Sequence, residues 1–271
     1  LLNDRNNVYC KEGVFDKAYT DAILKAKPSE DHNNNSSDTV LLCNIQCNHY
    51  ALLGGNHIRW GHHDNAHANN VIATLNEGLK DDTSSGDEEA RMAMLNNMGC
   101  VYASTCSAKT NELLMNYFTH TIHDNPSTED QDVDRKCLEA AVEHWQRGLH
   151  LTAIGSEKGE EGGIVMTPRV VYSRCTLLCN SAVVASYLGD RKRANELLSE
   201  ALADLNKAIL VHPGDLLLNL MLGKTLTMIG CAHLYGTEAV TAEGLFRASI
   251  DKFLLFEGDP RRVQCLYYIY M

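Results

Sequence analysis

The densest group of possible metal ligands is the segment HIRWGHHDNAH, residues 57–67, which contains four histidines. His63 and His67 are four residues apart, so on a helix they would share a face that could hold a metal ion. The segment lacks the His-Glu-x-x-His pattern, and Gly61 places part of it in a turn. We therefore predict an exposed polar turn and no metal site. A helical metalloenzyme that uses His62 together with this pair is the alternative.

Two pairs of cysteines also have a spacing that could bind metal, namely Cys43 with Cys47 and Cys175 with Cys179. A zinc site usually needs a second pair close by, whereas these pairs are far apart and each falls inside an apolar run. Free cysteine packs in such runs as a small hydrophobic residue. We expect core packing here, rather than zinc or redox chemistry, and a reducing intracellular compartment for a chain with ten cysteines.

The glycine-rich stretch at 159–163 could suggest a phosphate-binding loop. It lacks the Gly-x-x-x-x-Gly-Lys-Ser/Thr pattern, and the carboxylates of Glu160 and Glu161 would repel phosphate. No serine stands in a Gly-x-Ser-x-Gly elbow. The sequence therefore predicts no catalytic residues and no cofactor, and a protein that is not an enzyme.

A short pattern recurs at the start of three apolar runs that are typical of helices. It reads LLCN at 41–44, MLNN at 94–97 and LLCN at 177–180. Internal repetition indicates stacked supersecondary units, each of which needs its neighbours to bury its apolar face. Repeat units made only of helices predict an all-α fold without strands.

The elements expected around these runs are helical throughout. Apolar periodicity predicts about ten to twelve helices, including a hairpin over 1–27, helices over 39–53, 64–80, 88–105, 135–151, 214–229 and 239–256, and a hairpin that begins at 177, turns at 189–190 and continues to 213. Polar or glycine-rich inserts interrupt this array near 28–38, 81–87, 123–134 and 155–168. We expect residues 1–271 to form a single irregular solenoid. The chain opens on Leu1 instead of Met, so we also expect it to be a fragment.

The best-formed unit resembles a tetratricopeptide repeat (TPR). Ala182, Ala194, Leu198 and Ala201 stand where that repeat places the residues at which its two helices cross, and Gly189-Asp190 stands at the turn. Small side chains at such crossings allow close packing. The resemblance implies an α-solenoid of stacked antiparallel helical hairpins. Gly223 occupies the small position of the next expected pair.

The resemblance also singles out the asparagines of the recurring pattern, Asn44, Asn97 and Asn180. They fall at equivalent places on the first helices of their hairpins. In tetratricopeptide arrays those helices line the concave surface, where asparagine can hydrogen-bond the backbone of an extended peptide. We predict these three residues as partner-binding. The alternative is that they hydrogen-bond neighbouring helices.

A narrower likeness lies in the order of four segments. They are Asn96–Tyr102, Tyr117-Phe118, Leu178–Ala182 and Leu188-Gly189-Asp190. This order is similar to the tenth-subunit, tetratricopeptide family of the carbon-catabolite-repression–NOT (CCR–NOT) mRNA deadenylase complex. The likeness implies a non-catalytic scaffold in mRNA decay and translational repression that pairs with the eleventh subunit and the large NOT scaffold. A tetratricopeptide subunit of a vesicle-tethering or organelle-import assembly is the alternative.

Charge and hydropathy limit the other partners. The net charge is −11, with 24 basic and 35 acidic residues, whereas a sequence-independent nucleic-acid binder needs a basic face for phosphates. Hydrophobic residues make up 44% of the chain, but no uninterrupted apolar run approaches the roughly 18 residues of a membrane span. We expect protein partners, no direct nucleic-acid contact and no membrane. The expected location is the cytoplasm, with the nucleus as a second compartment.

Overall fold

The computed structural model describes most of the chain from Glu88 to Leu254. The described residues are 88–107, 128–157, 167–235 and 238–254, with 69, 72, 73, 75, 76, 79, 110 and 114. Of these residues 90% are helical and none is in a strand, which confirms the predicted all-α class for this part. The helices expected over 1–27 and 39–53 lie outside the described residues. The solenoid arrangement and the total of ten to twelve helices stay predictions.

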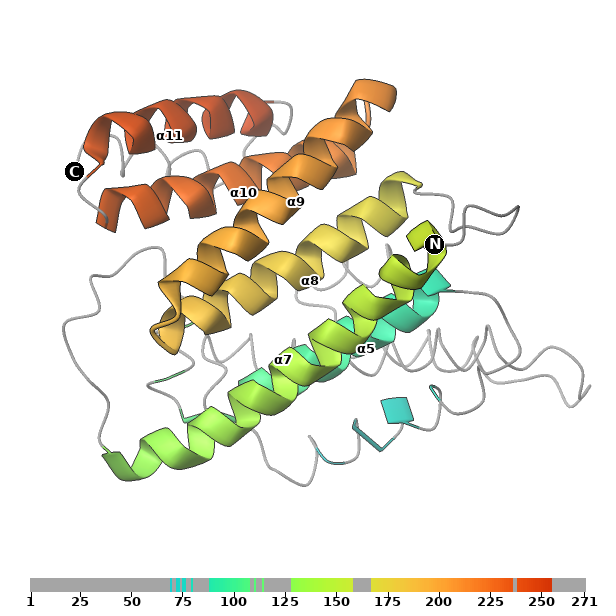
Figure 1. Ribbon diagram of the computed structural model, residues 1–271, viewed down its shortest axis with the longest axis vertical. Coiled ribbons are helices and arrows are strands. Elements are labelled where there is room, and N and C mark those ends of the chain that lie inside the picture. Colours follow the sequence, from blue (N-terminus) through green and yellow to red (C-terminus); the bar gives the residue numbers. More distant parts are fainter. Residues whose placement is uncertain are drawn as a thin grey trace, which may run out of the picture. The chain divides into compact units, whose positions relative to one another are not determined.

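Six helices are defined within the described residues (Figure 1). They are α5 Glu88–Ser104, α7 Thr128–Glu157, α8 Pro168–Tyr187, α9 Arg191–Val211, α10 Leu216–Tyr235 and α11 Ala239–Phe253. The chain divides into two compact units. The first unit comprises Leu1–Met115 with Ile122–Arg147, and the second comprises Asn116–Thr121 with Gly148–Met271. Helix α7 therefore begins in the first unit and ends in the second.

The first unit has a core of aliphatic and sulfur-containing side chains. Leu75, Met94, Met98 and Val101 are buried together, and they join the helical residues around 72–79 to α5. The described residues thus agree with the helices expected over 64–80 and 88–105. Methionine suits such a core because its unbranched side chain adapts to irregular gaps.

Helix α7 is longer than the sequence predicted. It was expected over 135–151, between polar inserts at 123–134 and 155–168, but it spans Thr128–Glu157. The predicted polar inserts are therefore wrong over 128–134 and 155–157, which are helical. A run of polar and acidic residues that looks like a loop in sequence is thus helical in the structure.

The second unit begins with a hairpin of α8 and α9, joined by a tight turn at the predicted place. Gly189 has a φ of +89°, and its N–H and that of Asp190 donate to the carbonyls of Ser186 and Ala185. These two bonds form a Schellman motif, in which glycine avoids the steric cost of the left-handed conformation. The Asp190 carboxylate then accepts from the Arg193 N–H at 3.0 Å and caps α9.

The start of α8 is set by a cap that the sequence analysis did not use. Thr167 Oγ1 accepts from the Val170 N–H at 3.3 Å, and Pro168 occupies the first turn, where its missing N–H costs nothing. The residues of the predicted crossing are buried in the largest described core, together with Cys175, Leu178 and Cys179. They are Ala182, Ala194, Leu198 and Ala201. Their burial agrees with close packing of α8 on α9.

Helices α10 and α11 form a second hairpin whose contact depends on two glycines. An added Cβ at Gly223 would lie 2.7 Å from the Phe253 ring, and one at Gly230 would lie 2.7 Å from the Phe246 ring. Gly223 precedes Gly230 on α10, whereas its partner Phe253 follows Phe246 on α11. The two helices therefore run antiparallel. Gly223 stands at the small position that the sequence predicted. The predicted end of this helix at 229 is wrong, because α10 continues to Tyr235.

Two buried hydroxyl groups lie in the same contact, between the glycine–phenylalanine pairs. The hydroxyls of Thr227 and Ser249 are 2.7 Å apart, and Ser249 Oγ is also 2.7 Å from the Gly223 carbonyl oxygen. Thr227 Oγ1 lies 3.0 Å from the same carbonyl. A shift of either helix along its axis would break the two bonds between Ser249 and α10, and a buried polar group that loses its partner costs about 1–3 kcal/mol. They therefore fix the register of the hairpin.

Helix α10 is the most apolar of the six described helices. Among the residues that the structure describes, its Leu216–Leu234 stretch is long and apolar enough to cross a membrane by length and composition alone. Over half of that stretch, 56%, is buried inside the protein. Its buried side chains pack against α8, α9 and α11. This burial is that of the core helix of a helical unit.

The contact between Gly223 and Phe253 predicts the effect of adding one methyl group. Gly223→Ala should lower the free energy of unfolding by about 1–2 kcal/mol, because overpacking outweighs the helix propensity gained. Urea unfolding followed by circular dichroism measures this loss. Gly244→Ala is the matched control on α11, since a Cβ there meets nothing within 4 Å. It should gain about 0.5–1 kcal/mol. Equal effects of the two substitutions would contradict the described contact.

Candidate functional site

The structure places two of the three predicted partner-binding asparagines. Asn97 lies on α5 in the first unit and Asn180 lies on α8 in the second, and both side chains are half-buried. Each already has an interaction within the protein. Asn44 lies outside the described residues. An amide group offers two donor hydrogens and an acceptor oxygen, so an internal interaction leaves capacity for a further hydrogen bond.

The neighbourhood of Asn97 is shaped by an aromatic residue of α7. Trp145 packs on Gly99, where an added Cβ would lie 2.2 Å from the indole nitrogen. That indole N–H donates to the Asn96 carbonyl oxygen at 3.2 Å. One turn further on, the rings of Tyr102 and His144 stack with their centroids 5.1 Å apart. These contacts hold α5 against the middle of α7, within the first unit.

A carboxylate cluster in the first unit was missed by the sequence analysis. Asp134 is only 4% exposed, although 123–134 was predicted as a polar connection. Its oxygens accept from the Ser107 N–H at 2.7 Å and from the hydroxyls of Ser107 and Thr110, each at 2.6 Å. Ser107 Oγ in turn accepts from the Thr110 N–H at 3.3 Å. The carboxylate thus fixes the turn that follows α5.

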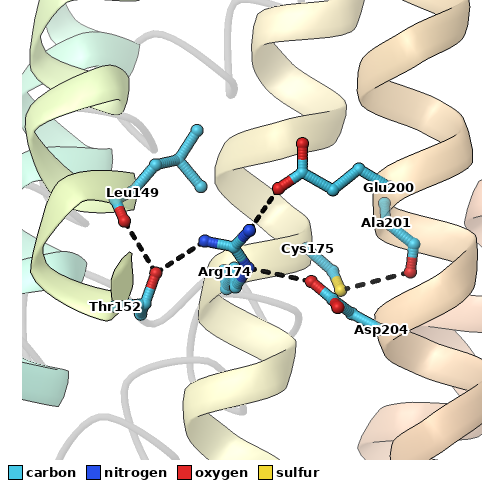
Figure 2. Close-up of polar contacts among 7 residues, drawn as sticks. All are labelled: Leu149, Thr152, Arg174, Cys175, Glu200, Ala201 and Asp204. Carbon is cyan, nitrogen blue, oxygen red and sulfur yellow. Dashed lines mark hydrogen bonds and ion pairs between the residues drawn. The ribbon is translucent and has the colours of Figure 1, made fainter. Parts of the chain in front are cut away.

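The second unit contains a cation that joins three helices, as Figure 2 shows. Arg174 on α8 donates through Nε to Asp204 Oδ2 at 2.8 Å and through its terminal nitrogens to Glu200 and Thr152. The Thr152 hydroxyl accepts from Arg174 at 2.6 Å and donates to the Leu149 carbonyl oxygen at 2.7 Å. These bonds connect the last part of α7 with α8 and α9.

The Arg174 cluster consists of contacts within the second unit. All three guanidinium nitrogens have partners, and the two carboxylates neutralise the cation. The Arg174 and Asp204 side chains are 16% and 19% exposed, so solvent screens this pair less than a surface pair. No periodicity or motif pointed to it, because its members lie far apart in the sequence. Only the fold brings them together.

The cysteines of α8 have the structural role that the sequence predicted. Cys175 and Cys179 are fully buried in the core of the second unit. Cys175 Sγ donates to the Ala201 carbonyl oxygen at 3.6 Å, and Cys179 Sγ lies 3.5 Å from the Thr225 hydroxyl oxygen. Burial raises the pKa of both thiols, which keeps them protonated and unreactive.

The other candidate metal ligands fall outside the described residues. These are the histidine cluster at 57–67 and the pair Cys43 and Cys47. Within the described part of the chain, no group of three or more His, Cys, Asp or Glu side chains is arranged to hold a metal ion.

Large aliphatic side chains are exposed where α9 meets α10, and we name this group the apolar corner. Its residues, with their exposed fractions, are Leu210 (85%), Val211 (71%), Leu216 (56%) and Leu217 (42%). Exposed apolar groups that are contiguous mark interaction sites more often than single ones do.

Comparison with known proteins assigns no family to this chain. The sequence matches no protein-family model and no curated protein. Functional inference therefore depends on the residues and contacts described above.

The partners of Arg174 predict a marked loss of stability when this cation is removed. Arg174→Met should cost about 1–3 kcal/mol, because it leaves the carboxylate of Asp204 largely buried and unpaired. Arg247→Met is the matched control. Its pair with Glu243 is an exposed i,i+4 contact, and the substitution should cost at most about 0.5 kcal/mol. Urea unfolding compares the two, and equal losses would contradict a stabilising role for the Arg174 cluster.

Proposed function

We propose that this chain is a non-catalytic protein-interaction scaffold of tetratricopeptide type that serves as a subunit of the CCR–NOT mRNA deadenylase assembly. The observation that carries the scaffold part is the α8–α9 hairpin. Its crossing residues Ala182, Ala194 and Ala201 are buried, and its helices are joined at Gly189 by a Schellman turn. In a tetratricopeptide array, a unit of this kind presents its first helix to the ligand on the concave surface.

Two surface features support binding of a protein partner. Asn180 lies half-buried on α8, the first helix of the hairpin, where a tetratricopeptide array contacts an extended peptide. The apolar corner adds aliphatic surface in the same unit. Protein interfaces combine an apolar centre with hydrogen-bonding groups of this type.

The assignment to the deadenylase assembly depends on the resemblance carried by Asn96–Tyr102 and Leu188-Gly189-Asp190. It names the eleventh subunit and the large NOT scaffold as partners, in the cytoplasm. Affinity purification of the tagged full chain, followed by quantitative mass spectrometry, tests this assignment. We expect both proteins in amounts comparable to the bait. Their absence, with membrane-tethering or import subunits in their place, would overturn it in favour of the alternative assembly.

Asn180 supplies a sharper prediction for the binding surface. Asn180→Ala should weaken partner binding roughly 3- to 10-fold, which corresponds to one hydrogen bond of about 0.5–1.5 kcal/mol. Asn195→Ala is the matched control, because Asn195 is exposed on the second helix of the same hairpin. Binding is measured by calorimetry with the purified partner, and thermal unfolding of each variant is measured in parallel. Weaker binding that accompanies an equal loss of stability would assign Asn180 to the fold instead.

A further inference from the structure

A pair of thiols in the first unit takes no part in the proposed scaffold function. Cys106 belongs to the turn after α5, and Cys137 lies on α7. Cys106 is 4% exposed, whereas Cys137 is partly accessible. We propose that these two residues form a peroxide-sensitive dithiol, which a hydroperoxide converts reversibly into an intramolecular disulfide.

The backbone brings the two sulfur atoms together. Cys106 Sγ donates to the Asp134 carbonyl oxygen at 3.6 Å. Cys137 follows Asp134 by three residues, so on α7 the two share a face. Cys106 Sγ therefore lies against the turn of α7 that carries Cys137, and the two side chains interact. The Asp134 carboxylate meanwhile holds the turn in place through Ser107 and Thr110.

The surroundings of the pair assign different roles to the two sulfurs. The neighbouring Cys106 side chain lowers the pKa of Cys137 to about 6, and Thr105 acts in the same direction. Burial and the negative charge of Asp134 oppose this lowering. The Cys137 side chain, burial and Asp134 all raise the pKa of Cys106. The accessible Cys137 is therefore the thiolate that attacks, and the buried Cys106 is the thiol that follows.

The reaction balances in two steps with hydrogen peroxide as the oxidant. The Cys137 thiolate attacks one peroxide oxygen, so that an S–O bond forms, the O–O bond breaks and hydroxide leaves. Cys137 is then a sulfenic acid and the peroxide has been reduced. The Cys106 sulfur attacks Cys137, forming the S–S bond, and the sulfenic oxygen leaves as water with the Cys106 proton. The sum is two thiols and one peroxide giving one disulfide and two waters.

A pH profile separates this arrangement from an ordinary surface cysteine. Alkylation of Cys137 by iodoacetamide should reach half of its plateau rate at about pH 6. A free cysteine peptide reaches half of its plateau at about pH 8.5. In Cys106→Ser the midpoint of Cys137 should still lie below that of the peptide, because a serine hydroxyl also donates to the thiolate. In Cys106→Ala it should move upwards, towards the peptide value.

The deciding experiment is a peptide map of the full chain after mild treatment with hydrogen peroxide. Trypsin releases 92–109 and 137–147, and chymotrypsin cleaves after Tyr102, which separates Cys100 from Cys106. We expect 106–137 linkage that dithiothreitol reverses, with Cys175 and Cys179 still reduced. Cys100→Ser is the matched control and should form the same linkage.

In Cys106→Ser, dimedone should trap a sulfenic acid at Cys137. If Cys106→Ser fails to fold, the peptide map of the wild-type chain is sufficient to test the proposal. Cys137 found as sulfinic acid beside a free Cys106 thiol would overturn the proposal, as would linkage of Cys137 to Cys100 or oxidation no faster than that of Cys175.

Discussion

The described structure depends on how closely its helices can approach, and glycine against an aromatic ring sets that distance. Three such contacts occur among the described residues, and each would place an added Cβ 2.2 to 2.7 Å from ring atoms. The pairs are Gly99 with Trp145, Gly223 with Phe253, and Gly230 with Phe246. An aromatic ring buries a large apolar area when a facing glycine leaves room for it. The spacing of the helix pairs follows from this fit.

Polar groups then specify which arrangement of closely packed helices is adopted. In the α10–α11 pair, the hydroxyls of Thr227 and Ser249 fix the register. Asp134 holds the turn after α5, and Arg174 joins α7, α8 and α9. A buried polar group is costly without its partners. Each cluster therefore destabilises alternative helix arrangements more than it stabilises the observed one. Apolar contacts supply most of the free energy, and these clusters select one structure.

The sequence predicted the helices better than their ends. Apolar periodicity identified 88–105 closely, since α5 spans Glu88–Ser104. It failed where polar residues are helical or buried, as at the start of α7, because composition cannot distinguish a solvated loop from a carboxylate that caps a turn. The predicted end of α10 was also too early. Glycine is typical of helix ends, and the sequence does not show that the Phe246 ring packs on Gly230.

Sites were harder to predict than elements. The cysteines of α8 could be assigned to the core because they stand inside an apolar run. Arg174 could not be paired with Asp204 or Thr152, since 22 to 30 residues separate these partners and the side chains form no motif. The Cys106 and Cys137 pair was hidden for the same reason. Long-range pairing of single side chains depends on helix ends, which are the least certain part of a sequence-based prediction.

The burial of α10 has a consequence for the chain as it is synthesised. Its faces are covered by α8 and α9, which precede it, and by α11, which follows it. During translation α10 therefore emerges before Phe246 and Phe253 exist to cover Gly223 and Gly230. At about 5–20 residues per second, its apolar surface stays open for roughly a second or more. In that interval this helix is the segment of the described chain best suited to chaperone capture, and the arrival of α11 ends that exposure.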